Sequence, residues 1–267
     1  MNEVFKCPVC GMVLHKDGVT LKCEKRHNYD ISSSGYVNLA MQQSGKTHGD
    51  DTLMVMARRD FLSEGYYQPL CEAVCEMAKG EYVLDAGCGE GYYTKSIANS
   101  ADVKKIYGID ISKKAVQYAS KLCKGEKFGT FCVGSVYDMP YIDGAFDSVV
   151  NIFSPLALDE YKRVLKKHGM LVLAVPDPEH LLELKKAVYD DVRVKEENDD
   201  VLEGFTLCEK RRVRYKFTPK TCKNIADLFA MTPYYYTTPA EKRGKLTDIT
   251  PFEITADFSI LLYRAEN

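Results

Sequence analysis

The chain has 267 residues, of which 45% are hydrophobic and 28% charged, and its formal net charge is −2. These values are typical of a globular protein with one large α/β domain and a small additional unit, and so small a net charge restricts any nucleic-acid-binding surface to a local patch. No apolar run approaches the ~18 residues of a membrane span, and residues 1–6 do not form a signal peptide, so we expect a cytoplasmic protein that binds no membrane.

The first forty residues are predicted to form a zinc-binding module. In a reducing cytoplasm cysteines serve as metal ligands or core residues, not as disulfides. Cys7 and Cys10 enclose a short knuckle, and Cys23 and His27 follow at a spacing that suits a hairpin. Three thiolates and one imidazole give a tetrahedral zinc site, without which so short a unit does not fold. Iron in the same thiolate site is the alternative.

A linker and two helices are predicted to follow the module. The segment from Gln42 to Asp51 is polar and is predicted to be the linker. Apolar residues recur at helical spacing from Thr52, and a second helix is predicted from about Tyr66 to Lys79. Cys71 and Cys75 lie one helical turn apart in it, and we interpret them as core residues and not as a metal or redox pair.

The stretch from Val83 to Thr94 carries the strongest functional signal. An apolar run ends at Asp85, glycines alternate at positions 87, 89 and 91, and a helix begins at about Tyr92. This pattern predicts a buried parallel strand that turns sharply into a helix, with a ligand lying against the glycine backbone. The dinucleotide fingerprint has different glycine spacing, and the carboxylate of Asp85 would repel a pyrophosphate. The carboxylate suits the ammonium group of S-adenosylmethionine (SAM), which favours a SAM site over that of a dehydrogenase.

The alternation of strand and helix continues to the end of the chain. Strands are predicted over residues 81–86, 105–110, 128–134, 146–152, 170–175, 210–217 and 252–263. Helical patterns between them predict an α/β, Rossmann-like fold, in which a mostly parallel seven-stranded sheet is covered on both faces. The last strand is predicted to be antiparallel, at or near the edge of the sheet.

Polar residues at the ends of these strands are the other candidates for the SAM site. Asp110 ends the second strand and can accept both hydroxyls of a ribose. Ser135 and Val136 follow the third strand and could frame an adenine. The segment from Asn151 to Pro155, which includes Phe153, follows the fourth strand and could form a lip over the reacting methyl group, although an ordinary loop explains it equally well.

Two charged segments belong to the C-terminal part of the chain. Residues 189–204 are acidic and are predicted to form a surface loop. The strand at 210–217 alternates basic and apolar residues, which is typical of a solvated edge strand, and contact with an RNA backbone is the alternative.

With these features in place, the chain resembles the bacterial 23S rRNA (guanine-N1) methyltransferase family over nearly its whole length. The residues that carry the resemblance are the Cys7, Cys10, Cys23 and His27 site, Gly35-Tyr36-Val37-Asn38-Leu39, Ala57-Arg58-Arg59-Asp60-Phe61-Leu62, Tyr67-Gln68-Pro69-Leu70, the segment from Asp85 to Thr94, and the segment from Pro178 to Lys185. We accordingly interpret residues 1–40 as a zinc-binding rRNA-recognition module, 41–80 as a linker and helices, and 81–267 as a SAM-dependent methyltransferase domain.

The resemblance also implies a set of SAM-binding residues and a partner. The implied residues are Tyr67, Gly87, Gly89, Glu90, Gly91, Tyr92, Asp110 and His180. The implied partner is 23S rRNA, bound largely through the zinc module, and the protein could act as a homodimer. The target guanine must be unpaired or flipped out of a hairpin, because N1 lies on its Watson–Crick edge.

The sequence leaves the catalytic groups and two other functions open. Asp147 and His180 are candidate acceptors of the N1 proton by position, and release of this proton to water is the alternative. Phe153 and the tyrosines at 234–236 are candidates for stacking on the base. A small-molecule SAM-dependent methyltransferase and a non-catalytic rRNA-binding protein are the alternative functions.

Overall fold

The computed structural model describes residues 4–41, 51–192, 200–247 and 249–266. Most of the predicted linker from Gln42 to Asp51 and the centre of the predicted acidic loop lie outside these ranges. Within the described residues, no helix is both long and apolar enough to cross a membrane.

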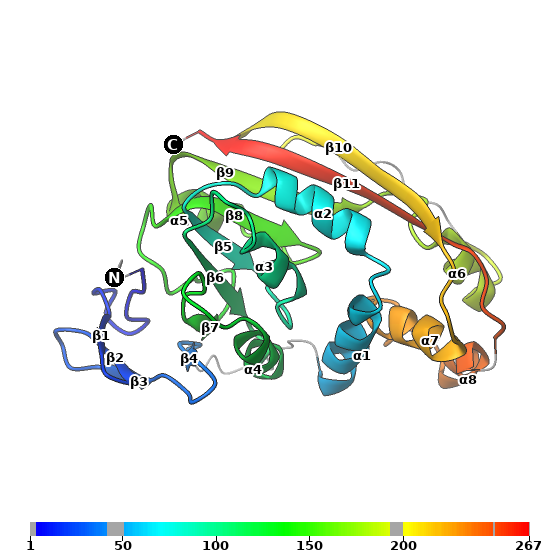
Figure 1. The fold of residues 1–267 in the computed structure, drawn as a ribbon, viewed down its shortest axis with the longest axis horizontal. Helices are drawn as coiled ribbons and strands as arrows, with labels where there is room; N and C mark the ends of the chain where they lie inside the picture. Colours follow the sequence, from blue (N-terminus) through cyan, green and yellow to red (C-terminus); the bar gives the residue numbers. More distant parts are fainter. Residues whose placement is uncertain (1–3, 42–50, 193–199, 248, 267) are drawn as a thin grey trace.

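The elements alternate along the chain much as the sequence predicts (Figure 1). The strands are β1 (His15–Asp17), β2 (Thr20–Lys22), β3 (Asn28–Asp30), β4 (Tyr36–Asn38), β5 (Tyr82–Ala86), β6 (Lys105–Asp110), β7 (Phe131–Val133), β8 (Phe146–Ile152), β9 (Leu165–Pro176), β10 (Phe205–Phe217) and β11 (Ile254–Ala265). The helices are α1 (Thr52–Ser63), α2 (Gln68–Met77), α3 (Tyr92–Ile97), α4 (Lys113–Leu122), α5 (Leu158–Val164), α6 (Leu182–Val188), α7 (Cys222–Ala230), α8 (Ala240–Gly244) and the 3₁₀ helix η1 (Lys245–Thr247).

One mixed sheet of eight strands organises the molecule, in the order β10-β11-β9-β8-β5-β6-β7-β4. The seven predicted strands are all present, which confirms the Rossmann-like methyltransferase sheet. The last strand, β11, pairs antiparallel with both β10 and β9, so that it lies second from the edge. The strands from β9 to β4 pair in parallel. Their carboxyl ends therefore meet at one edge of the sheet, where open α/β sheets bind ligands.

The eighth strand, β4, ties the N-terminal module to this sheet. The small sheet of β1, β2 and β3 is antiparallel and belongs to the module alone, whereas β4 pairs in parallel with β7. Residues around Tyr36 and Val37 follow the small sheet in sequence and could either extend it or join the main domain. The structure shows the second arrangement, so the residues before position 40 are not separate from the main fold.

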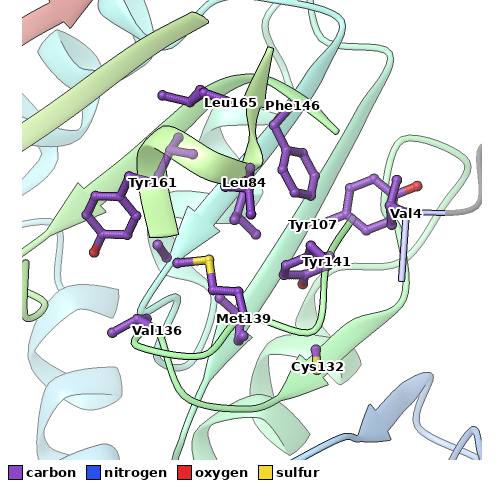
Figure 2. Packing of buried hydrophobic residues seen from close by; sticks show 14 of the residues in the cluster. Val4, Leu84, Tyr107, Cys132, Val136, Met139, Tyr141, Phe146, Tyr161 and Leu165 are labelled. Carbon is purple, nitrogen blue, oxygen red and sulfur yellow. The ribbon is translucent and has the colours of Figure 1, made fainter. Parts of the chain in front are cut away.

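Helices cover both faces of the sheet, and the core lies between them and the strands. Successive side chains of β5 point to opposite faces. Val83 packs with residues of α2 and α3, whereas Leu84 packs on the side of α5. On this second side Leu84 lies near Tyr107, Tyr141 and Phe146, and Val4 of the N-terminal module reaches the same cluster (Figure 2). The module and the methyltransferase domain thus share one hydrophobic core.

The basic strand β10 forms the edge of the sheet, and its charges are paired. Ion pairs join Lys210 to Asp200, Arg211 to Glu76, Arg212 to Asp257, Arg214 to Glu179 and Lys216 to Glu253. Basic residues that already form ion pairs with carboxylates contribute less free energy to the binding of a phosphate backbone. This arrangement favours the interpretation of β10 as a solvated edge strand.

Candidate active site and metal centre

Cys7, Cys10, Cys23 and His27 converge in the N-terminal module. Their ligand atoms all lie within 4.8 Å of one another, with 3.7 Å between the Sγ atoms of Cys10 and Cys23 and 3.5 Å between Cys7 Sγ and His27 Nδ1. A tetrahedral zinc ion with Zn–S of about 2.3 Å and Zn–N of about 2.0 Å separates its ligands by about 3.5–3.8 Å. The residues therefore fit Zn²⁺. In the described part of the chain no second cluster of this kind occurs, and Cys71 and Cys75 are core residues as predicted.

Two tight turns bring the four ligands together. The knuckle closes where the amide of Gly11 donates to the carbonyl of Cys7, with Gly11 at φ +73°. The second turn passes through Arg26 at φ +66° and brings the carbonyl of His27 to the amide of Cys23 at 3.1 Å. The hydroxyl of Tyr29 lies 3.3 Å from Cys7 Sγ, where it can donate to the thiolate and orient it.

A cavity of about 760 Å³ lies at the carboxyl ends of the parallel strands, within the size range of small-molecule sites. Seven of the predicted SAM-binding residues line it: Asp85, Gly87, Gly89, Glu90, Asp110, Ser135 and Val136. The structure therefore joins the glycine turn, the acid that ends β6 and the residues after β7 around one space, as the sequence predicts.

The glycine turn lets other elements lie directly against its backbone. Gly87, at φ +86°, lies beneath the loop that follows β8, and a Cβ atom added there would be 2.1 Å from the hydroxyl oxygen of Ser154. No side chain fits into that gap. The turn also forms a boundary of the cavity where a ligand can approach main-chain atoms.

Carboxylates make the cavity suited to a cation. Asp85 is 2% exposed, and its Oδ2 accepts a hydrogen bond from the hydroxyl of Thr94 at 2.5 Å. Burial, together with the nearby charges of Asp110 and Glu90, raises the pKa of Asp85 to about 7, because each of these factors disfavours its negative charge. A cationic ligand would reverse that effect.

Asp110 is held so that it can bind hydroxyl groups. Its two carboxylate oxygens accept hydrogen bonds from the amides of Gly89, at 3.0 Å, and Ser112, at 2.8 Å. A carboxylate oriented in this way, at the wall of the cavity, suits the hydroxyls of a ribose. The side chain of Ser135, on the neighbouring loop, accepts from the amide of Tyr137 at 3.1 Å.

Tyr67 and His180 meet each other, but neither lines the cavity. The hydroxyl of Tyr67 lies 3.4 Å from His180 Nε2, and His180 Nδ1 accepts from the amide of Asp257 at 3.3 Å. Burial and the charge of Lys185 lower the pKa of His180 to about 3, so this imidazole is neutral at physiological pH. Tyr67 also packs edge-on against Phe61 of α1, a helix that lines the cavity.

Three further predicted residues, Gly91, Tyr92 and Asn151, also lie just outside the cavity lining. The hydroxyl of Tyr92 donates to Gln68 at 3.2 Å, and Gly91 contacts α4. The side-chain Nδ2 of Asn151 donates to the carbonyl of Pro155 at 3.0 Å, and its Oδ1 accepts from the backbone amide of Ser154 at 3.3 Å. These two hydrogen bonds of Asn151 hold the backbone of the predicted lip.

The position of Asp147 does not agree with its prediction as a candidate proton acceptor. It lies at the beginning of β8, beside the first residue of β5, whereas the cavity is at the far end of both strands. There it accepts a hydrogen bond from the amide of Tyr82 and forms a 2.7 Å ion pair with Lys166. These contacts hold the strand ends together, and the structure does not bring Asp147 to the reacting groups.

The cavity also has lining residues that the sequence did not single out for this role. Arg58 of α1 is one of them, and its Nε lies 4.0 Å from Oε2 of Glu90. The others include Tyr93, Tyr137 and Lys6, from three other parts of the chain. The helical periodicity of α1 could have pointed to Arg58, since it shares a face with Met54 and Leu62, which also line the cavity. No pattern in the sequence around Lys6 indicates that it lines the cavity.

Comparisons with known proteins agree with this geometry. A family model described as "Methyltransferase domain" matches residues 77–225, and a zinc-ribbon model described as "RlmA, N-terminal" matches residues 5–44. A Bacillus subtilis protein named "Putative 23S rRNA (guanine-N(1)-)-methyltransferase YxjB" is 32% identical to this chain over 97% of it and 96% of its own length. The "23S rRNA (guanine(748)-N(1))-methyltransferase" of Streptomyces fradiae is 32% identical over 69% of this chain and 67% of its own. The structure of YcgJ from Bacillus subtilis has a similar fold, with a TM-score of 0.50 and 17% identity over 76% of this chain and 100% of that one.

The metal centre predicts a single bound zinc ion per chain, measurable by elemental analysis of purified protein. Substitution Cys23→Ser should remove most of it, because three ligands bind zinc far more weakly than four. Cys208→Ser is the matched control, since Cys208 is exposed and outside the cluster. Iron in the place of zinc, or full zinc content in Cys23→Ser, would contradict the assignment.

The pKa of Asp85 predicts how SAM affinity depends on pH. Only the ionised carboxylate attracts the cationic cofactor, and with a pKa of about 7 its ionised fraction falls as the pH falls below that value. The Kd for SAM should therefore rise by about tenfold for each pH unit lost below about pH 7 and level off above it, as calorimetry can measure. Asp85→Asn should bind SAM weakly, with little pH dependence. A Kd for the unchanged protein that stays flat across this range would rule out the role of Asp85.

Proposed function

Because this chain belongs to the 23S rRNA (guanine-N1) methyltransferase family, we propose that it transfers the methyl group of SAM to N1 of an unpaired guanine in a hairpin of 23S rRNA. The observation that carries the proposal is that one chain combines a cavity at the glycine turn with a Cys3His cluster, whose Cys7 lines that cavity. A small-molecule methyltransferase needs only the first of these, and a non-catalytic rRNA-binding protein only the second.

In the proposed complex, the cofactor lies along the seven predicted residues that line the cavity. Asp85 pairs with the ammonium group, Asp110 accepts from the ribose hydroxyls, and Ser135 and Val136 frame the adenine. Tyr67, Gly91, Tyr92, Asn151 and His180 act through their neighbours. Tyr67, for example, braces Phe61 and with it the helix that presents Arg58 to the cavity.

The reaction is an in-line displacement, for which the protein chiefly supplies alignment and exclusion of water. The N1 lone pair of the guanine forms a bond to the methyl carbon while the carbon–sulfur bond breaks. The electron pair of that bond stays on sulfur, which leaves neutral S-adenosylhomocysteine, and the N1 proton departs to a base or to water.

Two exposed aromatic residues on the cavity wall suit the target base. Phe153 is 43% exposed and Tyr137 64% exposed, and both line the cavity. Exposed aromatic rings are the side chains on which flipped-out bases stack. Phe153 has φ +57°, an uncommon conformation for a residue with a Cβ atom, in the loop that Asn151 holds. The tyrosines at 234–236 do not line this cavity.

The lining of the cavity supports a different candidate for the acceptor of the N1 proton. Asp147 and His180 do not line the cavity, whereas four carboxylates do: Asp85, Glu90, Asp110 and Asp138. Asp138 alone among these four is exposed, next to Tyr137 on the same loop. An exposed carboxylate can take a proton from N1 and return it to water, so we assign this role to Asp138 in the proposed mechanism.

The proposed substrate is tested by methyl transfer to rRNA that lacks the modification. Incubation with SAM carrying a labelled methyl group should place label in 1-methylguanosine of the large-subunit rRNA, as nucleoside analysis measures. Unlabelled RNA, in a preparation that binds SAM, would contradict the proposal and favour a small-molecule acceptor. Label in another nucleoside would retain the RNA substrate but exclude guanine N1.

A substitution at Phe153 tests whether its ring contacts the target base or the cofactor. Phe153→Ala should lower kcat/KM for RNA by about tenfold to a hundredfold, because base stacking contributes about 1–3 kcal/mol. The Kd for SAM should remain within about twofold of the unchanged protein, since the ring is assigned to the base. Tyr236→Ala is the matched control, because Tyr236 is an exposed aromatic residue that does not line the cavity. An equal loss of SAM affinity would place Phe153 on the cofactor instead.

A further inference from the structure

The zinc module forms part of the wall of the SAM cavity. Lys6, Cys7, Pro8 and Gly11 line the same space as Asp110 and Ser135. Cys7 is both a zinc ligand and a wall residue. The module is therefore placed to do more than contact RNA.

One attachment joins the module to the loop that follows β7. The amide of Lys6 donates to the carbonyl of Pro140 at 3.0 Å, and the amide of Ile142 donates to the carbonyl of Val4 at 2.8 Å. The ring of Phe5 stacks on that of Tyr141, with centroids 5.0 Å apart and an angle of 25° between the planes. These contacts hold the far end of the loop that begins with the predicted adenine-binding residues.

A second attachment holds the near end of that loop. Strand β4 pairs with β7, and the amide of Leu39 donates to the carbonyl of Val133 at 3.0 Å. Ser135 lies two positions beyond Val133. Leu39 and Met41 themselves line the cavity. The loop at 135–142 is thus fixed at both ends by residues that flank the zinc ligands in sequence.

The zinc ligands lie between these two attachments in sequence, so the metal can constrain the segment that joins them. The module has only the three-residue strands β1, β2 and β3 around its zinc ligands, and units of this size fold on binding their metal. Without zinc, the Cys7–Gly11 knuckle keeps its backbone hydrogen bonds but loses the link to Cys23 and His27, so the cavity wall next to Lys6 is less constrained.

We propose that zinc and SAM bind this protein cooperatively, because the zinc-ordered knuckle fixes the cavity wall and the loop at 135–142. The proposal rests on the cavity being the SAM site. Coupling free energies between sites commonly correspond to about 5-fold to 150-fold in affinity, and we expect about tenfold here. By reciprocity, SAM must raise zinc affinity by the same factor.

The first experiment compares SAM affinity with and without the metal. Calorimetry should give a Kd about tenfold higher for the full chain after zinc has been stripped by a chelator, with metal analysis confirming the loss. Circular dichroism shows whether the methyltransferase domain remains folded. Equal Kd values for folded protein with and without zinc would overturn the proposal. Failure of the zinc-loaded protein to bind SAM would instead contradict the cavity assignment on which the proposed function rests.

The second experiment keeps the zinc and cuts one attachment. Phe5→Ala removes the stack on Tyr141 but no zinc ligand, so it should raise the Kd for SAM by about fivefold at full zinc content. Val9→Ala is the matched control, because Val9 is on the same knuckle, is 57% exposed and does not line the cavity. Unchanged SAM affinity in zinc-loaded Phe5→Ala would overturn the proposed route through this loop.

The third measurement tests the reciprocal effect of SAM on zinc, under conditions in which the zinc-free protein remains folded. Release of zinc to a chelator is followed at increasing SAM concentrations. Cooperative binding predicts that saturating SAM lowers the apparent zinc dissociation constant by about tenfold, matching the first experiment. Zinc release that does not respond to SAM would overturn the proposal.

Discussion

The absence of side chains from the turn at Gly87, Gly89 and Gly91 is the constraint on which the active site depends. A Cβ atom at Gly87 would lie 2.1 Å from Ser154 Oγ, one at Gly89 3.2 Å from a guanidinium nitrogen of Arg58, and one at Gly91 3.0 Å from Ala119. Gly87 and Gly91 therefore admit the loop after β8 and helix α4, and Gly89 lies against the guanidinium group of Arg58 from helix α1. Two of these approaches, those of Ser154 and Arg58, bring residues that line the cavity next to the turn.

The carboxylates in this cavity favour the binding of a cation. Asp85 and Glu90 are almost fully buried, and Asp110 adds a third carboxylate within the influence of Asp85. Arg58 lies 4.0 Å from Glu90 and offsets part of this charge. The raised pKa of Asp85 shows that its ionised form is still unfavourable in this cavity. The positive charges of a sulfonium and an ammonium group would stabilise that ionised form. The fold thus holds its acids in an unfavourable arrangement that favours binding of a cationic cofactor.

Sequence patterns predicted the parts of this site that are local and missed those that depend on distant contacts. The glycine turn, Asp110 and the zinc ligands each belong to a short segment whose spacing expresses its geometry. The partner of β4 is β7, about ninety residues further along the chain, and a strand of three residues is too short for its sequence period to identify that partner. Asp147 could have been excluded as a proton acceptor, because it lies at the start of a predicted strand and the site lies at the carboxyl ends of the strands. The positions of Tyr67 and His180 relative to the cavity depend on packing against β11, which no local pattern records.

The distribution of charge and aromatic residues narrows where an RNA could bind. The basic strand β10 has its charges engaged in ion pairs with carboxylates, so the most basic segment of the sequence is a poor candidate. The exposed rings of Tyr137 and Phe153 lie instead at the cavity, whose wall includes Lys6 and Pro8 of the zinc module. The aromatic rings and the module residues line one cavity together with the glycine turn, so this face is a better candidate for contact with RNA than strand β10.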